Sequence, residues 1–226
     1  EIAQSLIIRG DVLVENSPVT KPGQSIHEDA VIRVRGELPK YVGRGGDKLE
    51  GALRFFNPFL SGLVALDLGA STGGFTDCLL QHGVTKVYAV DVGTAQLAEK
   101  LRQDSRVIVM EQFHAKDLAP ELFNPRPQLA VIDVSFIGLK KVLPFAAQVL
   151  LEPWTILALV KPQFELEPGS ISKGGIVELE SEQLRAVDSV IEFGKRQNWL
   201  SKGYSKSELK GAKSGNQEYF VFFQNP

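Results

Sequence analysis

The chain has 226 residues, of which 43% are hydrophobic, and its 25 lysine and arginine residues nearly balance 27 aspartate and glutamate residues. This length suffices for one full α/β domain and a small appendage. The near-neutral charge neither demands nor excludes a nucleic-acid partner, so any basic face must be local. The single cysteine, Cys78, excludes an internal disulfide framework and suits a reducing cytosol.

Hydropathy argues against a secreted or membrane-inserted protein. The N-terminal sequence lacks a secretion signal. The longest apolar stretch, residues 142–160, is broken by Pro144, Gln148, Glu152 and Pro153, and it predicts a helix followed by a strand. We expect a cytoplasmic protein that does not contact the membrane. Since the sequence begins at Glu1 and not at methionine, we also expect a piece of the natural N-terminus to be missing.

Residues 1–40 are expected to form a small separate unit. Apolar runs at 12–14 and 31–34 predict two short strands. Segments with proline at 16–18 and 21–23 predict turns between them. Such a unit is too small to hold a large core alone.

Residues 41–226 are predicted to form one α/β domain after a junction at 39–41. A glycine-rich entry at 43–46 precedes an apolar stripe at helical spacing, made of Leu49, Ala52, Leu53 and Phe56. Strand-like runs follow at 64–68, 86–90, 106–110, 129–133, 155–161 and 218–223. Helix-like runs lie at 75–81, 95–103, 139–151 and 181–197. This alternation predicts a mostly parallel sheet covered on both faces. Residues 162–176 are expected to be a mobile loop near the site.

The strongest functional signal is a small-residue turn between the first of these strands and the next helix. The turn follows Asp67 and Leu68, and the helix opens at Phe75. The residues of the turn are Gly69, Ala70, Ser71, Thr72, Gly73 and Gly74. Glycine lets a ligand lie against bare backbone at a helix start, which predicts a nucleotide-type cofactor site. An ordinary strand–helix turn is the alternative for this loop taken alone.

The loop chemistry favours S-adenosylmethionine over other nucleotides. Ser71 replaces the second glycine of a dinucleotide fingerprint, and the Gly-Lys-Ser/Thr ending of a phosphate loop is absent. The carboxylate of Asp67 would repel a phosphate but attract an amino group or a sulfonium. Asp91, at the end of the second strand, is placed to accept hydrogen bonds from ribose hydroxyls, and Asp117 follows the third strand, where an adenine edge could be read. The expected cofactor-binding residues are Asp67, Gly69, Ala70, Ser71, Gly73, Gly74, Phe75, Asp91, Val92, His114 and Asp133.

Four charged residues are candidates for chemistry. Asp133 and Lys161 end the fourth and fifth strands, whose carboxyl ends line one crevice of an open parallel sheet. A lysine at the end of a buried strand is costly unless its charge has a partner or a purpose. Taken singly, each of the four has an ordinary alternative. Lys161 and Lys48 could be solvated lysines, Asp133 could cap a helix, and Glu218 could be a charge at the edge of the sheet.

Five ordered motifs together resemble the TlyA (hemolysin A) family of FtsJ-related methyltransferases. The motifs span Gly43–Leu49, Asp67–Phe75, Asp133–Phe136, Val160–Glu165 and Gly215–Phe220. The resemblance implies a Rossmann-like class I methyltransferase fold at 41–226, with a mostly parallel seven-stranded sheet. It also implies a partial S4-like RNA-binding domain and linker at 1–40, without the helical first part of such a domain.

The resemblance further implies S-adenosylmethionine-dependent 2′-O-methylation of a ribose, of cytidine, in ribosomal RNA or ribosomal subunits. It implies a catalytic set of Lys48, Asp133, Lys161 and Glu218, with no metal ligands and no obligate protein partner. We assign Lys161 as the base, Asp133 as its orienting group near the methyl, Lys48 as the contact to ribose or phosphate, and Glu218 as the partner of one lysine. His114 stands where the family usually has asparagine.

Two basic groups could meet RNA phosphates, although solubility is an equally good reading of each. The first comprises Arg33, Arg35, Lys40, Arg44 and Lys48. The second comprises Lys202, Lys206, Lys210 and Lys213. Tyr41 and Phe136 could stack on a base, and core packing is the favoured use of Phe136.

Three other functions remain in competition. A pore-forming hemolysin is disfavoured by the lack of a membrane span or a cationic amphipathic helix. A methyltransferase fold that binds RNA without catalysis is disfavoured by the intact set of four charged residues. A small-molecule methyltransferase would have no need of the appended strands at 1–36.

Overall fold

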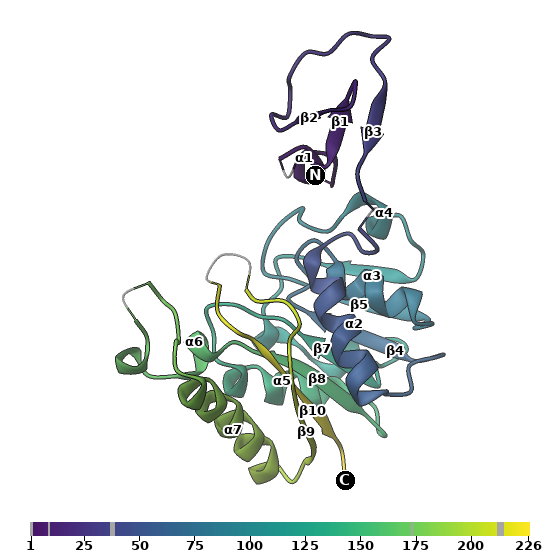
Figure 1. Ribbon diagram of the computed structural model, residues 1–226. Helices are drawn as coiled ribbons and strands as arrows, with labels where there is room; N and C mark the ends of the chain where they lie inside the picture. Colours follow the sequence, from purple (N-terminus) through teal and green to yellow (C-terminus); the bar gives the residue numbers. More distant parts are fainter. Residues whose placement is uncertain (1, 9, 37–38, 173, 212–214) are drawn as a thin grey trace.

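The computed structural model describes residues 2–8, 10–36, 39–172, 174–211 and 215–226, and Figure 1 shows a small N-terminal unit projecting from a larger α/β domain. The N-terminal unit contains one helix and a three-stranded antiparallel sheet in the order β2-β1-β3. Its elements are α1 (Ile2–Ile8), β1 (Val12–Val14), β2 (Ser17–Val19) and β3 (Ile32–Val34).

Strand β2 corrects the expectation of a turn at 16–18. Glu15 and Asn16 have φ values of 50° and 66° and form the turn, because Val14 already pairs with Ser17. Two successive residues with positive φ give the twist that a two-residue hairpin needs. Pro18, which follows Ser17, lies in the edge strand β2, where a missing N–H is tolerated. Helix α1 was not expected.

The larger domain is built on a seven-stranded sheet in the order β6-β5-β4-β7-β8-β10-β9. Strands β4 to β8 pair in parallel, whereas β10 is antiparallel to both of its neighbours. The strands are β4 (Val64–Leu68), β5 (Lys86–Val90), β6 (Val107–Met110), β7 (Leu129–Ile132), β8 (Thr155–Val160), β9 (Leu200–Lys206) and β10 (Tyr219–Gln224). The expected mostly parallel, seven-stranded α/β sheet is confirmed.

Strand β9 had no counterpart among the predicted strands. It lies at the edge of the sheet, and its exposed residues alternate with partly buried ones and the buried Ser205. An edge strand needs little apolar surface, so serine, lysine and glycine suffice and no apolar run marks it in the sequence.

Helices cover both faces of the sheet (Figure 1). The α-helices are α2 (Arg44–Phe56), α3 (Gly74–Gln81), α4 (Glu99–Arg102), α5 (Leu143–Val149), α6 (Pro162–Glu165) and α7 (Glu180–Arg196). Short 3₁₀ turns are η1 (Ala115–Asp117), η2 (Pro120–Leu122), η3 (Leu139–Lys141) and η4 (Pro168–Ser170). Val64, Leu66 and Leu68 pack in the cluster that contains α5 and α7, whereas Ala65 packs in the one that contains α2 and α3, as the two-residue period of a strand requires. Within the described residues, none of the helices combines the length and the hydropathy of a transmembrane span.

Two expected segments differ from the structure. The helix predicted at 95–103 is confined to α4, because the backbone N–H groups of Ala95, Gln96 and Leu97 donate to the Glu111 carboxylate. The segment 162–176, expected to be a loop, begins with the helical turn α6 and continues into η4.

The direction of β10 brings its first residues to the carboxyl edge of the parallel strands. Tyr219 pairs with Val160, the last residue of β8. Glu218 therefore lies beside the end of β8, where Lys161 follows. A parallel strand in the same place would have begun at the opposite edge of the sheet.

Helix α7 packs against β10 at Gly194, where an added methyl group is expected to destabilise the fold. A Cβ on Gly194 would lie 2.4 Å from the ring of Phe223, which is fully buried. Gly194→Ala is expected to lower the free energy of unfolding by about 1–3 kcal/mol through overpacking, measured by urea denaturation. Gly51→Ala on α2 is the control, because its Cβ would meet only the exposed, flexible Glu208 side chain. The control should be neutral or stabilising by up to about 1 kcal/mol, and equal effects of the two would contradict the packing argument.

Candidate active site

Two lysine–carboxylate pairs lie at the carboxyl edge of the sheet. The Nζ atom of Lys48, from the first turns of α2, donates to Oε2 of Glu218 at 2.6 Å. Lys161 follows β8 and Asp133 follows β7, and their Nζ and Oδ1 atoms form an ion pair at 2.6 Å. The structure thus brings together in pairs the four residues predicted from separate motifs.

Three of these four residues line one cavity of about 530 Å³. Lys48 and Glu218 face it from one side, and Lys161 from the end of β8. Further lining comes from Ser135, Phe136, Gln163, Phe164, Ile171, Gly174, Gly175 and Gly211. The cavity is large enough for a nucleoside-sized group and has two amines and one carboxylate in its wall.

Burial makes the pairing of these charges necessary. The Lys48 and Glu218 side chains are only 11% and 3% exposed, and those of Lys161 and Asp133 only 11% and 20%. Removing one partner of a buried pair leaves an uncompensated charge, which is strongly destabilising. Lys161 Nζ also donates to Ser135 Oγ at 2.8 Å, so its position is fixed from two sides.

The glycine loop packs closely against Asp133, the residue that follows β7. Gly69 has φ of 89°, and a Cβ there would lie 2.3 Å from the Asp133 carbonyl oxygen. Only glycine combines this left-handed conformation with so close an approach. Glycine at this position is therefore required by the packing of the loop against the residue that follows β7.

Asp91 and the loop are joined by hydrogen bonds. The N–H of Ser71 donates to Asp91 Oδ2 at 2.8 Å, and the N–H of Gly93 donates to Oδ1 at 2.7 Å. Each carboxylate oxygen retains acceptor capacity after one such bond. Asp91 can thus hold the loop and still accept a hydroxyl.

Asp67 lies beneath the loop and is fully buried. Oδ2 accepts from the Thr76 hydroxyl at 2.6 Å, whereas Oδ1 has no hydrogen-bond partner among the described residues. Burial raises the pKa of Asp67 to about 7, and the negative charges of Asp133 and Asp91 add to the shift, although the Thr76 hydrogen bond opposes it. A cation seated on the loop would favour the ionised form of this carboxylate.

Three other residues expected to bind the cofactor differ in the exposure of their side chains. Val92 is 62% exposed and His114 is exposed as well, so both side chains are free to flank a ring. The Phe75 side chain is 3% exposed and packs against Phe220, with ring centroids 5.9 Å apart. Phe75 can therefore offer a ligand only its backbone.

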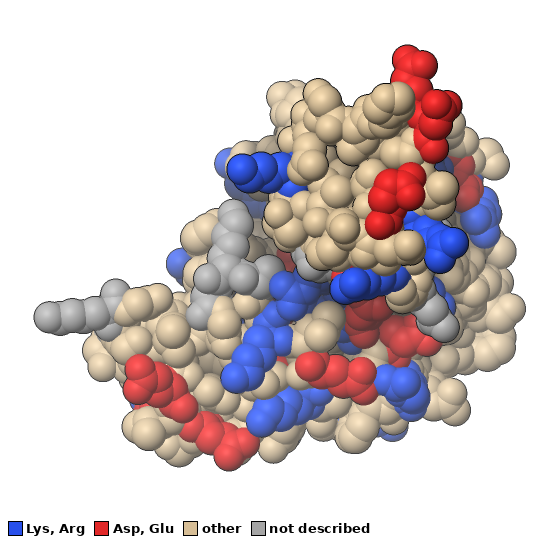
Figure 2. All heavy atoms as spheres, turned by 45° about the horizontal axis from the view of Figure 1, so that its top comes forward, with Lys and Arg blue, Asp and Glu red and all other residues tan. Residues whose placement is uncertain are grey.

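Lys48 of the first basic group is buried, whereas the other members lie on the surface, where not all of them are free. Arg33 and Arg35 are exposed on the N-terminal unit. Lys40 pairs with Glu50 at 2.6 Å, and the guanidinium of Arg44 donates to the Lys210 carbonyl at 3.4 Å. Figure 2 shows that lysine and arginine side chains on this face are interspersed with acidic ones.

The second basic group is partly described. Lys202, Lys206 and Lys210 are exposed, and Lys206 lies 3.7 Å from Glu180. Lys213 lies outside the described residues.

The aromatic residues near the site reverse the sequence-based preference. Phe136, expected to pack in the core, is 90% exposed, with φ of 65° and its ring 5.3 Å from that of Phe164. Tyr41, named with it as a stacking residue, is 2% exposed. Positive φ is a true outlier for a bulky residue, and such strain is typical of functional sites. The only feature of the sequence that could have marked Phe136 as a site residue was its position, with Ser135, shortly after the aspartate at the end of a strand.

Comparison with known proteins shows the family of this chain. The profile of the FtsJ-like methyltransferases matches residues 41–225. Hemolysin A of Brachyspira hyodysenteriae is 44% identical, with 98% of this chain and 92% of that protein aligned. The 16S/23S rRNA (cytidine-2′-O)-methyltransferase TlyA of Mycobacterium tuberculosis is 40% identical, with 98% and 83% aligned.

A solved structure from Streptococcus thermophilus, described as a candidate hemolysin, superposes with a TM-score of 0.83 at 40% identity. The superposition covers 99% of this chain and 82% of that one. Identity at this level over nearly the whole chain confirms the resemblance drawn from the five motifs. The chain belongs to the FtsJ-like methyltransferase family, among the proteins named TlyA or hemolysin A.

Proposed function

We propose that this protein transfers the methyl group of S-adenosylmethionine to the 2′-hydroxyl of a cytidine ribose in ribosomal RNA. The observation that carries the proposal is the cavity that Lys48, Lys161 and Glu218 share. The Lys161–Asp133 pair connects this cavity to the glycine loop, because the Asp133 backbone packs against Gly69. The name of the Mycobacterium tuberculosis relative, a 16S/23S rRNA (cytidine-2′-O)-methyltransferase, supports the choice of substrate.

The cofactor would lie along the carboxyl ends of β4, β5 and β7. The glycine loop would hold it, Asp91 would accept hydrogen bonds from its ribose, and Val92 and His114 would flank its adenine. Asp67 supplies negative charge from below. When bound, the cofactor supplies a methyl group on a positively charged sulfur.

Lys161 is the group placed to take a proton. A ribose hydroxyl is a weak nucleophile, so a base must accept its proton as the oxygen attacks the methyl carbon. In that step a C–O bond would form, the S–C bond of the cofactor would break, and the hydroxyl proton would pass to Lys161 Nζ, which can accept it only in its neutral form. Asp133 and Ser135 orient this amine from two sides. Much of the acceleration comes from alignment of the reacting atoms.

The remaining groups position the RNA. Lys48, held by Glu218, reaches ribose or phosphate from α2. Phe136 presents an exposed ring at the cavity, suited to stacking on a nucleobase taken out of a helix. Arg33, Arg35 and Arg44 supply phosphate contacts, and the unit at 1–40 acts as the S4-like RNA-binding part. With ribosomal subunits as partners, the protein works in the cytoplasm.

The direct test is transfer of labelled methyl groups to purified ribosomal subunits, followed by mapping of the modified ribose. Lys161→Ala should lower the methylation rate by about 10²–10⁴-fold, because the proton acceptor is lost, whereas cofactor affinity measured by calorimetry should persist. Lys195→Ala, an exposed lysine on α7, is the matched control and should be normal. Near-normal methylation by folded Lys161→Ala would refute the assignment of the base.

The pKa of Asp67 predicts a pH dependence of cofactor binding. Protonation below a pKa of about 7 removes the negative charge, so affinity for the cationic cofactor should rise up to about tenfold between pH 6 and pH 8. In Asp67→Asn, which can keep the hydrogen bond from Thr76, this rise in affinity should be lost. Any pH dependence that remains should come from titration of the cofactor's own amino group. Calorimetric titration of both proteins across this range measures the difference. The same pH profile and affinity in the variant would show that the carboxylate plays no part.

Phe136 should matter for RNA and not for stability. Loss of one stacking contact, worth roughly 1–3 kcal/mol, should lower kcat/KM for the RNA about 5–150-fold in Phe136→Ala. The free energy of unfolding should change by less than about 0.5 kcal/mol, because the ring is exposed. Phe59→Ala, a 77% exposed ring away from this cavity, is the control. If the two variants methylate RNA equally well, the stacking role is wrong.

A further inference from the structure

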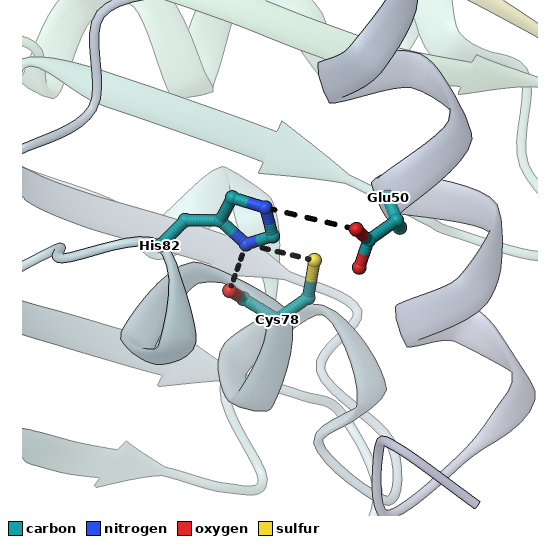
Figure 3. Close-up of side chains that lie close together, drawn as sticks. All are labelled: Glu50, Cys78 and His82. Atoms are coloured by element: carbon teal, nitrogen blue, oxygen red, sulfur yellow. Dashed lines mark hydrogen bonds and ion pairs between the residues drawn. The ribbon is translucent and has the colours of Figure 1, made fainter.

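Three side chains with metal-binding atoms meet between α2 and α3, apart from the catalytic cavity. Cys78 lies on α3, and His82, one helical turn after Cys78, directly follows the end of that helix. Glu50 faces both from α2 (Figure 3). One ligand atom from each lies within 4.8 Å of the other two. The family resemblance implied no metal ligands, and Glu50 is remote from the other two residues along the chain.

The hydrogen bond of His82 fixes which ring nitrogen is available. Its Nδ1 lies 2.8 Å from the carbonyl oxygen of Cys78. A carbonyl only accepts, so Nδ1 carries the proton and Nε2 keeps its lone pair. Nε2 points toward Glu50 Oε1 at 4.0 Å (Figure 3), which is too long for a hydrogen bond. A histidine held in this way by a backbone carbonyl is oriented like a metal ligand.

Glu50 is oriented in the same manner. Its Oε2 accepts from the hydroxyl of Tyr41 and from Nζ of Lys40, the latter at 2.6 Å. Both of these bonds go to one oxygen, which leaves Oε1 directed at the histidine. Outer partners of this kind fix the ligands of metal sites.

Cys78 supplies the soft ligand. Its side chain is fully buried, with Sγ 3.7 Å from His82 Nδ1. Burial raises the pKa of the thiol, so it is protonated in the absence of a metal. A combination of thiolate, imidazole and carboxylate selects zinc over magnesium or calcium, which prefer oxygen ligands.

We propose that Glu50 Oε1, Cys78 Sγ and His82 Nε2 bind a zinc ion. Binding displaces the thiol proton of Cys78 to solvent. A water molecule takes the fourth position, since the Glu50 and His82 side chains are 29% and 32% exposed. Tetrahedral zinc brings its nitrogen and oxygen ligands to about 3.3 Å from each other, so the present 4.0 Å between Glu50 and His82 must contract slightly. The ion would clamp α2 to α3, the helix that begins at the cofactor loop.

The first test is titration of the chelator-treated full chain with zinc chloride by calorimetry. We expect one equivalent to bind with a Kd of about 1 μM or tighter. At a hundredfold excess over Kd the melting temperature should rise by roughly 5–10 °C. Cobalt chloride in place of zinc should give the near-ultraviolet charge-transfer absorption of a cobalt–thiolate bond. This readout is independent of methyl transfer, so it can fail while the proposed function stands.

Variants separate this site from adventitious binding. Cys78→Ala, His82→Gln and Glu50→Gln should each weaken zinc binding at least about tenfold, and Cys78→Ala should abolish the cobalt–thiolate absorption. His27→Gln, on the N-terminal unit, is the matched control and should bind normally. His82→Gln, at a partly exposed position, serves if Cys78→Ala fails to fold. Absence of saturable binding at about 100 μM zinc, or equal binding by wild type and His82→Gln, overturns the proposal.

Discussion

The antiparallel pairing of β10 with β8 is the constraint on which the catalytic arrangement depends. Five strands run in parallel and deliver their carboxyl ends, with Asp67, Asp91, Asp133 and Lys161, to one edge. Strand β10 runs the other way and delivers its beginning, so Glu218 arrives at the same edge. Because Glu218 is buried there, a cation must accompany it, and Lys48 of α2 provides one. One strand direction thus links the C-terminal segment to the first helix of the domain.

The two ion pairs share this edge but differ in their surroundings. The Lys48–Glu218 pair is nearly inaccessible and holds α2 to the start of β10. Lys161 and Asp133 lie in loops, with Ser135 as a further partner and the strained, exposed Phe136 beside them. Both lysines are held by partners at this edge, which suits the alignment of reacting groups that the proposed function requires.

The glycine loop connects the proposed cofactor site to the proposed catalytic residues. Gly69 packs on the Asp133 carbonyl, and Asp91 accepts from the Ser71 N–H, so the loop, Asp91 and Asp133 form one connected framework. Helix α3 extends this framework, since it starts at Gly74 and ends next to the Glu50–Cys78–His82 cluster. A metal clamp at that end would steady the helix without touching the reacting atoms.

Local sequence determined the α/β alternation, the glycine loop and the strand ends that carry Asp133 and Lys161, because apolar periodicity and turn chemistry act over a few residues. It did not determine the edge strand β9 or the shortness of α4, where the Glu111 carboxylate, and not a helix, takes up the backbone N–H groups. It also misplaced Phe136 and Tyr41, one exposed and the other buried. These features depend on partners distant along the chain. Which residues meet across the sheet is fixed by strand order and register, and only the tertiary structure supplies them.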